Sequence, residues 1–306
     1  MRFPGIIPAV TTPFDATGAI DLAGLEHNLV ALLDAGVHGF VGTGTMGEAG
    51  SLSAAERRSA IEATVRVAGG RVPVIAGASA GTASAAAAYA NDAAQAGADA
   101  IMLLPPLGYR GDEREILAFY RAVASAAGLP LVAYNNPEAS GTDMPPALIA
   151  RLAAEVEHVV AIKECSGDAR RIAALLNAAP GLEVLVGGDD WALEGLCAGA
   201  TGWISGVAVC APAECVELYD ACRAAELEHA RAIFGRLLPL ARLDMTPKLV
   251  QYFKGAQDAL GFAGGPVREP RLELDESDRA VLDAALAALR RDATMTGAVA
   301  GGAPAL

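Results

Sequence analysis

The sequence predicts a (β/α)8 barrel with additional C-terminal helices, and three observations support this fold class. Short apolar runs alternate with longer segments of helical composition. Eight such runs start roughly 20 to 35 residues apart, which suits a strand, a helix and two short loops. Several runs are rich in valine and isoleucine and end at glycine or proline, as buried parallel strands do. A doubly wound open sheet is the alternative, because a count of units alone does not exclude it.

The eight expected strands share this composition, and a helical segment follows each of them. They begin at Gly5, His38, Val72, Asp99, Pro130, His158, Glu183 and Gly202. One helix start has its own signal, because Ser53 is followed three residues later by Glu56 and this spacing is typical of a capping box. The expected barrel covers residues 1–210. Residues 211–292 are expected to form a helical extension packed on it, and residues 293–306, which are small and featureless, are expected to be disordered.

Composition excludes several classes of protein. Hydrophobic residues make up 53% of the 306 residues and charged residues 19%, so a large folded core is expected. The net charge of −13 argues against nucleic acid and anionic membranes as partners. Five cysteines occur without a metal-binding spacing, so we expect reduced thiols and no metal. No apolar run is long enough to span a membrane and the N-terminus lacks a signal-peptide core, so we expect a cytoplasmic protein.

Polar groups are expected to meet at one end of the barrel, because active sites of this fold lie at the C-terminal ends of the strands. Thr11 and Thr12 end the first expected strand, Tyr134 falls near the end of the fifth, and Lys163 falls near the end of the sixth. Hydroxyls, a phenol and an amine above an apolar barrel predict a site for a small molecule.

Lys163 is the most informative of these residues. It follows the apolar run 159–162 and is one of only three lysines, with Lys248 and Lys254. Burial lowers the pKa of a lysine from about 10.4 toward roughly 7–8 in functional cases. The neutral amine is then a nucleophile that forms a Schiff base with a ketone or aldehyde. The alternative interpretation is a structural lysine paired with the adjacent Glu164.

Three further features each allow a functional and a structural interpretation. Tyr134 could relay protons beside the amine, or fill the core with its hydroxyl bonded. The turn GTGTMGE, 42–48, could present N–H groups to the carboxylate of an oxo acid or to phosphate, or could only connect a strand to a helix. The GGDD segment, 187–190, could face the substrate, or Asp190 could cap the next helix.

Together these segments resemble the dihydrodipicolinate synthase / N-acetylneuraminate lyase family of class I aldolases. The motifs PAVTTPFD, GTMGE, YNNP, IKECSGD and GGDD occur in family order between Gly5 and about residue 290. The resemblance implies a (β/α)8 barrel with extra C-terminal helices and usually a homotetramer built from dimers. It also implies a Schiff-base lyase that uses no metal or organic cofactor.

The resemblance further implies roles for individual residues. Lys163 would form the Schiff base with a 2-oxo acid, typically pyruvate, and Tyr134 would transfer protons. Thr45, with the N–H groups of the 44–47 turn, would hold the substrate carboxylate. The residues expected to bind or surround the substrate are Thr12, Gly44, Met46, Gly47, Gly188 and Ile204.

Departures from the family pattern argue against a role in lysine biosynthesis. Met46 replaces the second threonine of the family's Gly-Thr-Thr-Gly-Glu turn. After the YNNP turn the chain has Glu138 and Ala139, where true dihydrodipicolinate synthases have an arginine for the second substrate. Leu107 stands where those enzymes have a relay tyrosine, and Tyr109 lies two residues further on.

The expected activity is therefore aldol cleavage, dehydration or deamination of a 2-oxo acid through a lysine imine. Candidate substrates are a hydroxyproline-derived pyrroline carboxylate and a 2-oxo-3-deoxy sugar acid. A hypothesis from another class is a non-catalytic sensor that binds an oxo acid in an inherited pocket. An enzyme acting on phosphorylated sugars is disfavoured, because GGDD places two acids where phosphate would bind.

Overall fold

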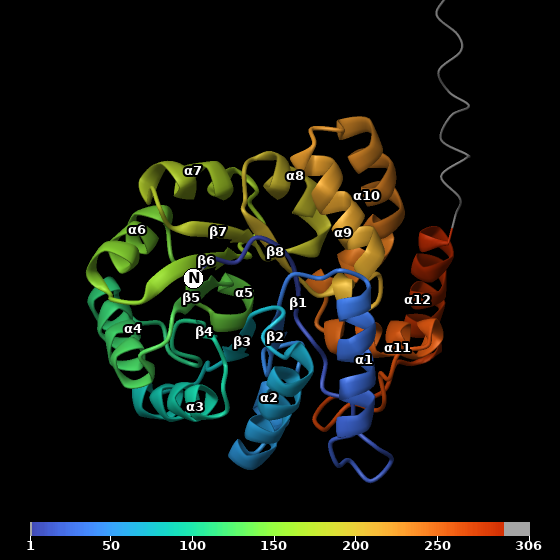
Figure 1. Cartoon of the computed structure of the whole chain (residues 1–306), viewed down its shortest axis with the longest axis horizontal. Helices are drawn as coiled ribbons and strands as arrows, with labels where there is room; N and C mark the ends of the chain where they lie inside the picture. Colours follow the sequence, from blue (N-terminus) through green and yellow to red (C-terminus); the bar gives the residue numbers. More distant parts are fainter. Residues whose placement is uncertain (1, 291–306) are drawn as a thin grey trace, which may run out of the picture.

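The computed structural model describes residues 2–290, and within them eight parallel strands form a single curved sheet in the order β1-β8-β7-β6-β5-β4-β3-β2. A further backbone pairing between Ala9 and Val41 joins the ends of β1 and β2, so the sheet forms a nearly closed barrel (Figure 1). The predicted fold class is confirmed. The strands are β1 (Gly5–Pro8), β2 (Phe40–Gly42), β3 (Val74–Gly77), β4 (Ala100–Leu103), β5 (Leu131–Asn135), β6 (Val159–Glu164), β7 (Glu183–Val186) and β8 (Gly202–Ser205).

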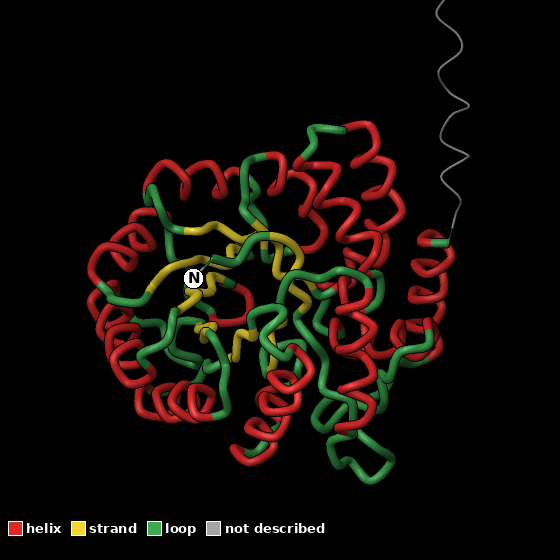
Figure 2. Tube along the Cα trace, in the orientation of Figure 1, coloured by secondary structure: helices red, strands yellow, loops and turns green. Residues whose placement is uncertain are grey.

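Helices surround the strands, as the tube in Figure 2 shows. Ser53 begins one of them through the predicted capping box, since its hydroxyl accepts from the Glu56 N–H while the Glu56 carboxylate accepts from the Ser53 N–H. The barrel helices are α1 (Leu22–Asp34), α2 (Ala54–Ala68), α3 (Ala83–Gln95), α4 (Glu113–Ala127), α5 (Pro137–Ser140), α6 (Pro146–Glu155), α7 (Arg170–Ala178) and α8 (Ala192–Cys197).

The core lies inside the barrel and between the strands and their helices. Nearly every strand residue is buried on both sides, which explains why the strands read as continuous apolar runs rather than as alternating ones. Ile6, Ile75, Ile101 and Ile162, from four different strands, are all fully buried in this core. The apolar packing holds the strand ends, and the polar residues on them, in fixed positions.

The C-terminal segment brings a further part of the chain to the barrel mouth. It comprises α9 (Pro212–Arg223), α10 (Leu227–Ala241), the short helix η4 (Arg242–Met245), α11 (Leu249–Leu260) and α12 (Glu276–Leu289). The helix α9 packs on α8 and β1, so it takes part in the outer ring, although the predicted division at residue 210 leaves it outside. The contact of η4 with η2 (Asp189–Trp191), which follows β7, places η4 beside the strand ends.

Three further predictions concern membrane-spanning segments, the division of the chain and its C-terminal tail. No helix among residues 2–290 is long and apolar enough to cross a membrane. The division into a barrel and an extension stays a prediction. The tail predicted at 293–306 lies outside the described residues.

Candidate active site

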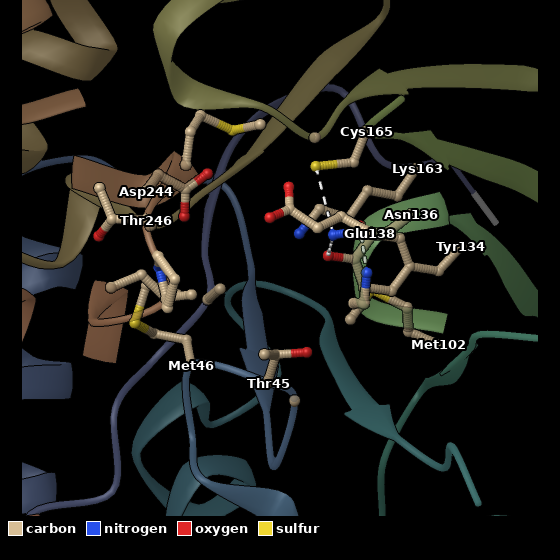
Figure 3. A pocket seen from close by; sticks show the side chains of 18 residues that line it. Thr45, Met46, Met102, Tyr134, Asn136, Glu138, Lys163, Cys165, Asp244 and Thr246 are labelled. Atoms are coloured by element: carbon tan, nitrogen blue, oxygen red, sulfur yellow. Dashed lines mark hydrogen bonds between the residues drawn. The ribbon is translucent and has the colours of Figure 1, made fainter. Parts of the chain in front are cut away.

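A cavity of about 220 Å³ opens at the C-terminal ends of the strands. Five of the predicted residues line it: Gly44, Thr45, Met46, Tyr134 and Lys163. The other lining residues are Ala9, Met102, Asn136, Glu138, Ala139, Cys165, Gly187, Gly206, Asp244, Met245, Thr246, Pro247 and Leu249. Figure 3 shows Lys163, Tyr134 and Cys165 on one side of the cavity, with Asp244 and Thr246 on the other.

Strand β6 delivers Lys163 to this cavity beside Tyr134. The two residues are register partners on adjacent strands, and the Lys163 Nζ lies 4.4 Å from the centroid of the Tyr134 ring. The lysine is only 7% exposed, yet within residues 2–290 its Nζ forms no hydrogen bond or ion pair. A β-carbon on Gly187 would lie 2.9 Å from the Lys163 Cγ, so the glycine leaves room for the lysine side chain.

Glu164 does not pair with Lys163. Successive side chains of a strand point to opposite faces, and the Glu164 carboxylate faces away from the cavity. It accepts hydrogen bonds from the Asn135 Nδ2 at 3.1 Å and from the Ser166 N–H at 2.6 Å. The interpretation of Lys163 as a structural partner of Glu164 is therefore wrong.

The charge on Lys163 differs from the sequence expectation. Burial lowers the pKa of its amine, but the acidic groups around it raise the pKa by more, so the pKa lies above the ordinary lysine value. Those groups are Tyr134, Cys165, Asp244 and Asp189. The expected lowering of this pKa is wrong for the free protein, in which the ammonium form predominates. The amine must therefore lose a proton before it can act as a nucleophile.

Tyr134 is placed to supply or accept a proton. Its hydroxyl oxygen accepts a hydrogen bond of 3.0 Å from the Asn136 Nδ2, and the ring is 5% exposed. Burial raises the pKa of the phenol to about 12, while the charge on Lys163 acts in the opposite direction. The phenol is therefore protonated at neutral pH and can donate its proton inside the cavity.

The turn after β2 offers free N–H groups to the cavity. Within residues 2–290 the N–H groups of Gly44, Thr45 and Met46 donate to no protein acceptor. Thr43, which precedes them, adopts a left-handed conformation with φ of 51°, uncommon for a β-branched residue. Successive free N–H groups in such a turn form a concave site for an anion.

The remaining predicted residues lie behind the cavity lining. The Thr12 hydroxyl donates to the Gly47 carbonyl at 2.8 Å and so fixes the turn from below. Gly188 and Ile204 are buried and do not line the cavity, whereas Gly187 and Gly206 do. Four of the residues predicted to bind the substrate therefore do not line the cavity, and their direct contact with it stays a prediction: Thr12, Gly47, Gly188 and Ile204.

Two acidic side chains also line the cavity, and of these the sequence placed only Glu138 near the substrate, at the position of the family's arginine. Glu138, on α5, is exposed at the mouth, and Asp244, on η4, is half-buried. Burial raises the pKa of Asp244 to about 6, although the charge on Lys163 lowers it. A signal for Asp244 was available, since Asp244 and Pro247 fall in a short break between two helical patterns, at LDMTP.

Asp189 forms a second, fully buried carboxyl group beneath the site. It accepts hydrogen bonds from the Trp203 Nε1 at 2.8 Å, from the Gly206 N–H at 3.2 Å and from the Val207 N–H at 2.6 Å. It therefore ties β7 to the turn after β8. The alternative that Asp190 caps the next helix is wrong, because α8 begins without a side-chain cap. Within residues 2–290 no group of three His, Cys, Asp or Glu side chains is arranged to hold a metal ion.

Comparison with known proteins gives the family. The model of the dihydrodipicolinate synthetase family matches residues 2–289. A 4-hydroxy-tetrahydrodipicolinate synthase from Methanothrix thermoacetophila is 37% identical over 285 residues, which cover 92% of this chain and 95% of that protein. An uncharacterized DapA-like lyase from Halobacterium salinarum is 36% identical over 288 residues, which cover 93% of each protein.

A solved structure gives the same result. The chloride-inhibited dihydrodipicolinate synthase from Acinetobacter baumannii, complexed with pyruvate, superposes with a TM-score of 0.89 at 32% identity. The match covers 94% of this chain and 99% of that one. The chain belongs to the dihydrodipicolinate synthetase family and is a lyase of the class I aldolase type.

Proposed function

We propose that Lys163 forms a Schiff base with the carbonyl carbon of a 2-oxo acid such as pyruvate, and that this imine carries the lyase reaction. One observation supports the proposal above the others. A buried lysine amine lies in a small cavity, 4.4 Å from a tyrosine ring, and no other group within residues 2–290 engages it. The Acinetobacter baumannii enzyme was solved with pyruvate, which is a 2-oxo acid.

The chemistry follows from these groups. The deprotonated amine attacks the carbonyl carbon, a C–N bond forms, and the carbonyl oxygen leaves as water. The Tyr134 phenol donates a proton to the oxygen and recovers one from the nitrogen, so the phenol is unchanged overall. The proton that the Lys163 ammonium gave up before the attack completes the departing water. The resulting iminium withdraws electrons from the adjacent carbon. The bond that joins this adjacent carbon to the next carbon of the chain can then break. The adjacent carbon keeps the electron pair, which is stabilised as an enamine.

The turn 44–46 would hold the other end of the reacting group. Three free N–H groups can donate to a carboxylate next to the reacting carbonyl, and the Thr45 hydroxyl lies on the same turn. The backbone N–H of Met46 can donate just as that of a threonine would. Loss of the family threonine's hydroxyl therefore does not remove this subsite. Fixing the carboxylate here orients the carbonyl carbon toward Lys163.

The substrate that we propose is a catabolic 2-oxo acid rather than the pair of substrates used in lysine biosynthesis. Glu138 and Ala139 occupy the position of the arginine that the resemblance associates with a second carboxylate. Leu107 lines an adjoining cavity that shares Gly44, Thr45 and Tyr134 with the one around Lys163. Tyr109 is 54% exposed, and its hydroxyl donates to Glu115. We also propose a tetramer built from dimers.

Borohydride trapping tests the proposal. The protein is incubated with pyruvate, the imine is reduced, and the intact mass is measured for the native chain and for Lys163→Ala. We expect a reduced pyruvate adduct on the native chain and none on the variant. If no 2-oxo acid gives an adduct but several raise the melting temperature without turnover, the non-catalytic sensor replaces the enzyme.

A further inference from the structure

The charged groups of the cavity are unevenly distributed. Of the residues that line it, only Lys163, Glu138 and Asp244 carry a formal charge. The single amine and the free N–H groups of the 44–46 turn lie on the side where the reacting carbonyl and its carboxylate would bind. The two carboxylates line the remaining part, with Asp244 across the cavity from Lys163 (Figure 3).

Asp244 lies beside a second carboxyl group, that of Asp189, whose pKa is raised well above the ordinary value by burial. A β-carbon on Gly206 would lie 3.0 Å from the Asp244 Oδ1 and 3.1 Å from the Asp189 Oδ2, so two carboxyl groups flank one glycine. Within residues 2–290 no basic side chain comes within ion-pair distance of Asp244 or Glu138. Their charge is therefore not neutralised by a salt bridge.

Two side-chain donors of the cavity are already engaged, Asn136 beside Tyr134 and Thr246 beside Asp244 (Figure 3). The Asn136 Nδ2 donates to the Tyr134 hydroxyl and to the Cys165 sulfur. The Thr246 hydroxyl donates to the Leu243 carbonyl at 2.8 Å. The polar groups left for the far end of a substrate are therefore the oxygens of Glu138 and Asp244, which accept hydrogen bonds when ionised.

We infer that Glu138 and Asp244 recognise the far end of the substrate and select a 2-oxo acid that carries hydroxyl groups there, in place of a second carboxylate. This inference rests on the proposed function, because the imine at Lys163 and the carboxylate at the 44–46 turn fix the direction of the substrate. Hydroxyl groups donate to the two carboxylates. A second substrate carboxylate would be repelled by both and would meet no cation there.

A substrate with a terminal amine fits less well. The iminium at Lys163 places one positive charge in the cavity until cleavage of the substrate bond converts it to the neutral enamine. An added ammonium would be attracted by the two acids but repelled by this iminium in the same small space. A neutral hydroxyl group gains the hydrogen bonds without that repulsion.

Three matched substrates test the inference. They are 2-oxo-3-deoxy acids of equal chain length that end in a hydroxymethyl, a carboxylate or an aminomethyl group. Measured as kcat/KM for pyruvate release, we expect the native protein to prefer the hydroxymethyl compound over the carboxylate by about 100-fold or more. Asp244→Asn and Glu138→Gln should each reduce that ratio by about tenfold. Glu157→Gln, which removes a carboxylate 90% exposed, is the control and should leave the ratio unchanged.

The ratio between two substrates separates recognition from a general effect. A change in the pKa of Lys163 alters both rates alike and leaves the ratio constant. A native ratio near one, a ratio that neither variant changes, or a preference for the amine would overturn the inference. Should Asp244→Asn fail to fold, Glu138→Gln at the exposed mouth carries the test. Pyruvate carries no group that Glu138 or Asp244 could recognise. Borohydride trapping with pyruvate therefore tests the proposed function independently of this inference.

Discussion

Two buried lysines in this chain differ in what surrounds their amines. Lys163 is 7% exposed at the barrel mouth, and its Nζ forms no hydrogen bond or ion pair within residues 2–290. Lys254, on α11, is 2% exposed, and its Nζ donates to the Glu48 Oε1 at 2.8 Å and to the Pro266 carbonyl at 2.6 Å. Burial alone therefore does not identify a reactive amine. Both lysines line a cavity, so what distinguishes Lys163 is that no protein acceptor within residues 2–290 engages its amine.

The pKa shifts of the two lysines support the same conclusion. Burial lowers the pKa of Lys254, and the attraction of Glu48 does not fully offset it. The pKa of Lys163 is raised, because the surrounding acidic groups outweigh burial. If a lowered pKa alone identified the nucleophile, Lys254 would be chosen instead of Lys163. The hydrogen-bonding environment selects Lys163, since a nucleophile needs room for its target.

The largest expected effect comes from removing the amine in the cavity. Lys163→Ala should lower turnover of any accepted 2-oxo acid by at least about 10⁴-fold, as loss of a covalent nucleophile does. The melting temperature should fall only modestly, because no ion pair or hydrogen bond is lost, although the raised pKa shows that the folded state favours the ammonium. Steady-state kinetics and a thermal melt check both parts. If Lys163→Ala kept more than about one hundredth of the native turnover, another group would form the intermediate.

Removing the phenol should have the next largest effect. Tyr134→Phe keeps the ring beside Lys163 but deletes the proton donor, so kcat should fall by about 10²–10⁴-fold. The KM should change little, since the 44–46 turn is intact. Kinetics of turnover and of imine formation measure the effect. A loss of less than tenfold would assign the proton transfers to another group.

The paired lysine should matter for stability instead. Lys254→Met leaves the fully buried Glu48 carboxylate with only the Arg271 guanidinium, at 3.5 Å, as a cation, which should lower the free energy of unfolding by about 3 kcal/mol. Denaturant titration measures this loss. The double variant Lys254→Met/Glu48→Gln should recover much of it, because the orphaned charge is removed. An equally unstable double variant would show that the cost is one of packing.

The smallest effect is a gain in stability from Asp244→Asn. The folded state raises the pKa of Asp244 from 3.8 to about 6, so it favours the protonated form. The stability that this provides is complete below pH 3.8 and is lost as the pH rises through about 6. The asparagine variant should therefore be more stable by about 1–3 kcal/mol at pH 7.5, and no more stable near pH 4. A gain that does not depend on pH would contradict this origin.

Local patterns in the sequence were sufficient for the fold and for half of the site. Apolar runs and glycine boundaries located all eight strands, and the position of Lys163 at a strand end placed it at the barrel mouth. The motifs also brought Tyr134 and the 44–46 turn to the same cavity. These features are determined within a few residues of chain, which is why sequence reasoning finds them.

The other half of the site depends on contacts between distant parts of the chain, and the break at LDMTP marks Asp244 without placing it at the cavity. Asp244 reaches the cavity only because η4, far along the chain from β6, packs at the barrel mouth. The raised pKa of Lys163 was missed because it depends on how closely Tyr134 and Cys165, and to a smaller extent Asp244 and Asp189, surround the amine. Gly187 rather than Gly188 lines the cavity, a difference of one residue set by the packing of Lys163.

Mapping the site of reduction by borohydride tests the central claim most directly. The native chain is treated with pyruvate and borohydride, digested, and sequenced by tandem mass spectrometry, with the adduct scored at Lys163, Lys248 and Lys254. The lysine that faces the cavity should carry the adduct in nearly every labelled molecule, and Lys254 should carry none. An adduct distributed over the exposed Lys248 and the other lysines, or absent from Lys163, would contradict the account.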